Sequence, residues 1–100
     1  MPPLKIKCRK IKCGRKRIDA FCIKLMSKNL ILFLGSKGYV MCGYLNMRSA
    51  DKFKDAAVKI TGVSTINESL KADAGSLSRE AKKLGIYKGQ PIKEVLKIIA

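Results

Sequence analysis

The stretch LILFLGSKGYVMCGYL, Leu30 to Leu45, contains two apolar runs joined by a short polar segment. Every residue from Leu30 to Leu34 is apolar, which is typical of a strand buried on both faces of a sheet. The residues from Ser36 to Gly38 are types that favour turns, and a second apolar run begins at Tyr39. The stretch therefore predicts two adjacent strands inside a sheet.

Two more strands are predicted on the N-terminal side of this pair. In LKIKC, Leu4 to Cys8, apolar and charged residues alternate as in a half-buried strand. The pair Arg9-Lys10 interrupts the alternation, which resumes one residue out of phase, so we expect a bulge or the end of the strand there. The tract GRKR at residues 14–17 predicts a turn into a further strand at residues 18–26. Together these segments predict a four-stranded meander.

The C-terminal side of the pair changes from strands to helices. The segment AAVKITG at residues 56–62 predicts a fifth strand. TINESL contains a capping box, in which the Thr65 hydroxyl accepts a hydrogen bond from the N–H of Glu68, and it predicts a helix over about residues 66–71. Helical spacing of the apolar residues from Ala74 to Leu84 predicts a second helix.

A third helix is predicted near residue 100. Gly85 suits a left-handed cap that ends the second helix, and Pro91 suits the first turn of the third. The apolar stripe of this third helix consists of Ile92, Val95, Leu96 and Ile99. Strands followed by helices predict a single α+β domain over residues 1–100. We expect an antiparallel or mixed sheet of about five strands, with two to three C-terminal helices packed on it.

Positive charge is concentrated at the N-terminus. The formal net charge is +15, and residues 1–28 hold ten Lys or Arg against the single acid Asp19. Such a surface fits a nucleic acid or another polyanion, and it also fits a solvated lysine-rich face; the sequence leaves both interpretations open. The candidate nucleic-acid contacts are Lys5, Lys7, Arg9, Lys10, Lys12, Arg15, Lys16 and Arg17, on the predicted N-terminal hairpin.

Cysteine and histidine content limits the chemistry. The chain has four Cys and no His, and none of the cysteines forms a C-x-x-C pair, so we expect no metal site and no cofactor. The missing His also removes the usual base of Cys-His and Ser-His dyads, which makes a non-enzyme the favoured interpretation. No apolar run reaches the roughly 18 residues of a membrane span, so we expect a cytoplasmic protein with free thiols and no membrane partner.

The glycine turns have two interpretations, a conformational role, which is favoured, and a small-anion site. Glycine backbone at these turns would leave N–H groups free to meet an anion, with a nearby lysine and the start of the first predicted helix assisting. The candidate residues are Lys37, Gly38, Cys42, Gly43, Gly62 and Thr65. Cys42 has two interpretations, a reactive thiol or a small core residue, and the second is favoured because no base is available to activate it.

Three sequence segments resemble the YunC-like family, a group of bacterial and archaeal proteins classed as a domain of unknown function. They are KGYVMCGYL, then GV-x-T-x-x-x-x-L at Gly62 to Leu70, and A-x-x-LGI-x-x-G at Ala81 to Gly89. The resemblance implies an α+β fold and a homo-oligomer, with the N-terminal β-structure, about residues 4–26, taking part in assembly. It implies no catalytic residue.

Three functions follow in order of preference. The first is a cytoplasmic homo-oligomer of the YunC-like family with no assigned activity. The second is a nucleic-acid-binding module that uses the basic N-terminal hairpin. The third is a small-anion-binding or catalytic protein with a pocket near the glycine turns.

Overall fold

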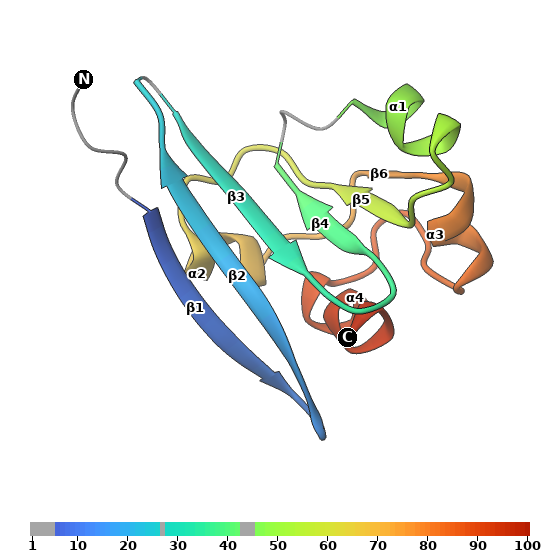
Figure 1. Cartoon of the computed structure of the whole chain (residues 1–100), viewed down its shortest axis with the longest axis horizontal. Helices are drawn as coiled ribbons and strands as arrows, with labels where there is room; N and C mark the ends of the chain where they lie inside the picture. Colours follow the sequence, from blue (N-terminus) through green and yellow to red (C-terminus); the bar gives the residue numbers. More distant parts are fainter. Residues whose placement is uncertain (1–5, 27, 43–45) are drawn as a thin grey trace.

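Figure 1 shows the computed structural model of the chain, which describes residues 6–26, 28–42 and 46–100. The strands are β1 (Ile6–Cys13), β2 (Lys16–Lys24), β3 (Asn29–Leu34), β4 (Tyr39–Met41), β5 (Ala57–Lys59) and β6 (Ser76–Leu77). The helices are α1 (Met47–Lys52), α2 (Ile66–Leu70), α3 (Arg79–Lys83) and α4 (Ile92–Ile99). The predicted α+β fold is confirmed, with six strands in the described residues where about five were expected.

The strands lie in the sheet in the order in which they follow one another in the chain. β1 to β4 are antiparallel neighbours, as the predicted meander requires, whereas β4 and β5 are parallel. Parallel neighbours need a crossover connection, and α1 supplies it. Ala50 of α1 packs against Ala57, beside Tyr39 and Met41. Helix α1 therefore covers one face of the sheet at β4 and β5.

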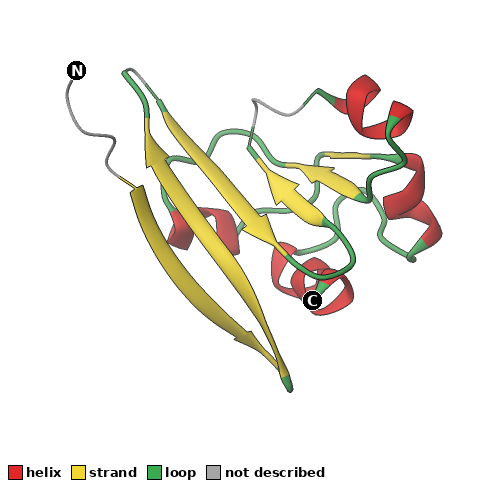
Figure 2. Cartoon of the chain, in the orientation of Figure 1, coloured by secondary structure: helices red, strands yellow, loops and turns green. Residues whose placement is uncertain are grey.

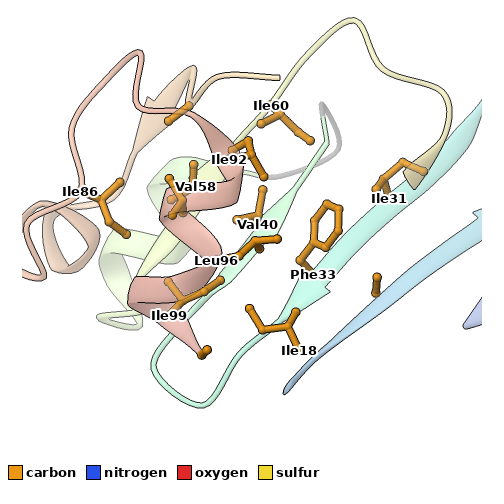
Figure 3. Close-up of a cluster of buried hydrophobic side chains, with 14 of the residues drawn as sticks. Ile18, Ile31, Phe33, Val40, Val58, Ile60, Ile86, Ile92, Leu96 and Ile99 are labelled. Atoms are coloured by element: carbon orange, nitrogen blue, oxygen red, sulfur yellow. The ribbon is translucent and has the colours of Figure 1, made fainter. Parts of the chain in front are cut away.

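The other face of the sheet carries the main core (Figure 3). The predicted apolar stripe of α4 is confirmed, since Ile92, Val95, Leu96 and Ile99 are all buried. These side chains belong to one cluster with Phe33 of β3 and with Ile18, Val40 and Val58 from neighbouring strands. Helices α2 and α4 lie behind the sheet in the view of Figure 2. We call the face that they cover the inner face, and the opposite face the outer face.

The bulge or strand end predicted at Arg9-Lys10 is wrong. β1 pairs with β2 without interruption from Ile6↔Ile23 to Cys13↔Lys16. The alternation of apolar residues shifts by one residue because the first half of β1 has its apolar side chains on one face of the sheet and the second half has them on the other. Ile11 packs on the core at the inner face, whereas Ile6 lies on the outer face and is 53% exposed.

The helix predicted over Ala74 to Leu84 is correct only in its second half. α3 begins at Arg79, and β6 takes the place of the expected first turns. Ser78 is the cause: its Oγ accepts hydrogen bonds from the N–H of Ala81 at 3.2 Å and from that of Ala57 at 2.8 Å. One side chain thus starts the helix and fastens it to β5.

The turn between β3 and β4 closes over the end of α4. Lys37 N donates to the Ile99 carbonyl at 2.8 Å, and Ser36 Oγ donates to the backbone oxygen of Ala100 at 3.0 Å. A Cβ built on Gly35 would lie 2.2 Å from Ile99 O. Glycine is required here because the helix end and the turn approach each other backbone to backbone.

Candidate anion-binding cleft

A cleft of about 470 Å³ lies between the inner face of β1–β3 and the segment that leads into α2. Its volume is within the usual range of small-molecule sites. The residues that line it are Lys7, Arg9, Cys22, Lys24, Asn29, Ser64, Thr65, Ile66 and Asn67.

Strand register places the sheet residues of the cleft on one face. Side chains two residues apart on a strand share a face, and so do directly paired residues on neighbouring strands. Lys7 pairs with Cys22, and Lys24 pairs with Asn29. Arg9 follows on the same face of β1, so three strands contribute to one wall.

The opposite wall is fixed by the start of α2. Thr65 is the N-cap, with extended backbone, and its Oγ1 accepts from the N–H of Glu68 at 3.0 Å. This half of the predicted capping box is confirmed. The Thr65 hydroxyl also donates to Glu68 Oε1 at 3.3 Å, and Ile66 is buried in the core. The wall is therefore held by a local hydrogen bond and by hydrophobic packing.

Two hydrogen bonds join the walls. Arg9 Nη1 donates to Asn67 Oδ1 at 2.9 Å, across 58 positions of sequence. Asn29 Nδ2 donates to the carbonyl oxygen of Ser64 at 2.8 Å. Each bond links a strand to the segment around the start of α2, so the cleft has a defined width.

The charges of the cleft are all positive. Lys7, Arg9 and Lys24 line it, and no Asp or Glu does. Within the described ranges the one ion pair joins Lys83 and Glu80, which are both in α3. The nine residues outside those ranges include no Asp or Glu that could pair with a cation of the cleft. The three cations of the cleft therefore have no carboxylate partner in the chain, and an anion is the ligand that complements them.

A match to a protein family includes the residues of one wall of this cleft. The family described as Domain of unknown function (DUF1805) matches residues 41–99, which include the segment from Ser64 to Asn67. The chain belongs to this family. The resemblance noted from the sequence is supported at this level, that of a domain of unknown function.

A solved structure resembles this DUF1805 protein over its full length. The crystal structure of a protein of unknown function from Thermoplasma acidophilum matches 100% of this chain and 98% of that chain. Sequence identity is 35% and the TM-score is 0.92. The likeness therefore includes β1–β3, which lie before the family match. No curated protein matches the chain at a significant level.

The structure separates Lys37 and Gly38 of the predicted anion site from Thr65. Lys37 and Gly38 lie at the turn after β3, whereas Thr65 lies near Asn29, at the start of that strand. Five residue steps of strand separate these ends by roughly 17 Å. Among the residues of this set that the structure describes, only Thr65 lines the cleft.

The remaining glycines of that set have conformational or packing roles. Gly62 has a φ of +71°, and a Cβ on it would meet nothing within 4 Å, so the residue is selected for its turn geometry. A Cβ on Gly38 would lie 2.5 Å from Ala56 O, which makes it a close-packing glycine. Gly43 lies outside the described residues.

Cys42 is packed as a core residue. It is 5% exposed, and its Sγ accepts a hydrogen bond from Ile31 N at 3.3 Å. This environment agrees with the packing interpretation of the sequence. Cys13 is partly buried, and burial raises the pKa of its thiol, although the Lys97 ammonium offsets part of the change. Neither environment favours a reactive thiolate.

The basic residues of the hairpin divide between two faces. Lys7 and Arg9 point to the inner face, whereas Lys10, Lys12 and Arg17 lie on the outer face by the register of β1 and β2. Arg15 is in the turn, and Lys16 Nζ donates to the backbone oxygen of Ala100 at 3.4 Å. Lys5 lies outside the described residues. Strand alternation thus splits the predicted basic ribbon into two smaller groups.

Tyr39 gives the fold a pH dependence at alkaline pH. Burial raises its pKa, and the hydrogen bond of its hydroxyl to Asp55 Oδ2, at 3.1 Å, and the charge of that carboxylate raise it further. A raised pKa means that the folded state binds the proton more tightly. The stabilisation is complete below the unfolded pKa of about 10 and is lost as pH rises through the folded pKa.

We therefore expect the free energy of unfolding of the native protein to fall more steeply above about pH 10 than that of Tyr39→Phe. Urea unfolding of both proteins at a series of pH values measures the difference, and because both contain the same lysines the comparison isolates Tyr39. Parallel pH profiles would contradict the assignment.

Proposed function

We propose that the protein acts as a homo-oligomer whose subunits pack through the outer face of β1–β3. The observation that carries this proposal is an apolar patch on the outer face of β1–β3, and no helix lies in front of these three strands in Figure 2. By strand register the patch consists of Ile6, Cys8, Phe21, Ile23, Leu30, Leu32 and Leu34. Ile6 is 53% exposed and Leu34 is 41% exposed.

The position of the patch supports an interface. Its apolar part crosses three strands about 4.8 Å apart over some four to five residues of about 3.4 Å each, on the order of 200 Å² in projection. An exposed apolar patch that is rimmed by polar and charged side chains is a feature of interaction sites. Packing two such faces together would bury them about 10 Å apart, as in a sheet sandwich.

The distribution of charge along the hairpin supports a second copy as the partner. The outer-face cations Lys10, Lys12 and Arg17 lie toward the turn, whereas Ile6, Cys8 and their neighbours on β2 lie toward the other end. A twofold axis through the patch would bring the apolar halves together and place the two cationic tips at opposite ends. Self-association then buries apolar surface without opposing like charges.

The proposal also includes a cytoplasmic location, membership of the YunC-like group and a role of the N-terminal hairpin in assembly. Four free cysteines, of which Cys8 is exposed, support a reducing compartment such as the cytoplasm. None of the helices in the described residues is long and apolar enough to cross a membrane. The segment KGYVMCG supports placement in the YunC-like group of the family. The division of hairpin cations between faces supports self-association over nucleic-acid binding as the role of β1 and β2.

Sedimentation equilibrium tests self-association and its salt dependence. At micromolar concentration we expect a mass of two or more chains of 11.1 kDa each. Because each chain carries +15, added salt screens repulsion between subunits and should strengthen the association. An 11.1 kDa species at every concentration and salt level would overturn the proposal.

A further inference from the structure

We propose that the cleft between β1–β3 and the start of α2 binds a small phosphorylated molecule. Three observations carry this inference: the unpaired positive charge of the cleft, its size, and its mixture of polar rim and apolar floor. None of them depends on the self-association proposed above, because the cleft opens on the inner face and the patch lies on the outer face.

Arg9 supplies the geometry for phosphate recognition. Its guanidinium has five N–H donors, and one described hydrogen bond, to Asn67, holds the group in place across the cleft. The remaining donors keep the planar fork that matches two oxygens of one phosphate. A guanidinium that is already positioned loses little conformational entropy when the ligand binds.

Lys7 and Lys24 supply charge from the neighbouring strands β1 and β2. Lys7 is exposed on β1, and Lys24 is exposed at the end of β2. With Arg9 they place three positive charges around one cleft, more than a singly charged anion neutralises. The charge therefore favours a ligand with at least two negative charges, as a phosphate ester or a diphosphate has.

The size and the floor of the cleft favour an organic phosphate. A volume of about 470 Å³ exceeds the need of one phosphate group and leaves room for an attached organic part. Cys22 and Ile66 supply apolar surface in the cleft, and both contact the main core. Asn29 keeps a second amide N–H, beyond the one that bonds to Ser64, that can orient the ligand.

Isothermal titration of the full chain with pyrophosphate, in a phosphate-free buffer of about 0.1 M ionic strength, tests the site. We expect saturable binding of one pyrophosphate per chain, weakened about tenfold or more by Arg9→Gln, because charge-assisted hydrogen bonds are lost. Lys12→Gln is the matched control, since it removes the same charge from the same strand on the opposite face. We expect it to leave the affinity within about twofold of the native value, since an exposed charge at that distance is largely screened.

Two readouts guard against a folding defect or a diffuse charge effect. If thermal unfolding shows that Arg9→Gln is not folded, Lys24→Gln, at an exposed position, takes its place with the same expected loss. Bound pyrophosphate should also slow alkylation of Cys22 in the cleft and leave that of Cys13, which is partly exposed and does not line the cleft, unchanged. Mass spectrometry of the peptides measures both cysteines in one sample.

The proposal would be overturned by the absence of saturable pyrophosphate binding, by equal weakening by Arg9→Gln and Lys12→Gln, by equal protection of Cys22 and Cys13, or by tighter binding of citrate than of pyrophosphate. The last would assign the cleft to carboxylates. A single-stranded oligonucleotide that binds more tightly than pyrophosphate and loses affinity with Lys12→Gln would assign the charge to nucleic-acid binding.

Discussion

Leu32→Glu should convert the assembled protein into an 11.1 kDa monomer. Leu32 belongs to the outer-face patch and is paired with Phe21 on β2 and Met41 on β4. In an interface formed by this patch, the new carboxylate would be buried without a partner, which costs several kcal/mol. That is on the order of a thousandfold or more in the association constant.

The matched control is Leu84→Glu. Leu84 is also a partly exposed leucine, 38% exposed, but it lies at the end of α3, away from β1–β3. The native protein, Leu32→Glu and Leu84→Glu should be compared by sedimentation equilibrium, with circular dichroism to confirm that each is folded. Loss of association in the Leu84 variant, or its retention in a folded Leu32 variant, would place the interface elsewhere.

Gly35→Ala should give the largest loss of stability among the glycine substitutions described here. Its Cβ would lie 2.2 Å from Ile99 O and 2.6 Å from Ile99 C, so the turn and the end of α4 must separate. Separation breaks the hydrogen bonds from Lys37 N and Ser36 Oγ that satisfy the last carbonyls of the helix. We expect a loss of about 2–4 kcal/mol in the free energy of unfolding, from steric displacement and broken hydrogen bonds.

Gly14→Ala is the control for the glycine effect. Gly14 has a φ of +66°, and a Cβ on it would meet nothing within 4 Å. Its substitution carries only the cost of a left-handed backbone, about 1 kcal/mol. Urea unfolding measures both variants. A Gly35→Ala variant no less stable than Gly14→Ala would contradict the close approach of the turn to α4.

Local sequence signals predicted the elements whose structure is itself local. The capping role of Thr65 and the buried stripe of α4 need only spacing along one helix. The helix expected from Ala74 failed because Ser78 hydrogen bonds to β5, which lies 21 positions earlier in the chain. Its helical spacing was present, but a tertiary contact fixed where the helix begins.

The bulge expected at Arg9-Lys10 shows how a strand with apolar residues on both faces can mislead a prediction from alternation. An out-of-phase apolar pattern usually indicates a bulge, since one face is expected to be buried along the whole strand. In β1 the apolar residues near Ile6 lie on the outer face and those near Ile11 lie on the inner face. The out-of-phase pattern therefore indicated that the apolar side chains change face, while the pairing of β1 with β2 continues without a bulge.

The cleft could be predicted only in part from the sequence. Lys7 and Arg9 were candidates for nucleic-acid contacts, whereas Thr65 was a candidate for the small-anion site. Cys22, Lys24, Asn29, Ser64, Ile66 and Asn67 were missed. The missed residues join the site through strand pairing and through the contact of β1 with α2, for which the 58 positions between Arg9 and Asn67 give no local signal. Strand alternation did place Lys7 and Arg9 on one face, and that was the available clue.

The location of the subunit interface is tested most directly by intermolecular NOEs in a mixture of ¹³C-methyl-labelled and unlabelled chains. We expect them at the methyl groups of Ile6, Ile23, Leu32 and Leu34 on the outer face, and not at the core methyl groups of Ile92 and Leu96. Intermolecular NOEs confined to another exposed residue such as Leu84, or none in a sample shown to be oligomeric, would contradict assembly through the outer face of β1–β3.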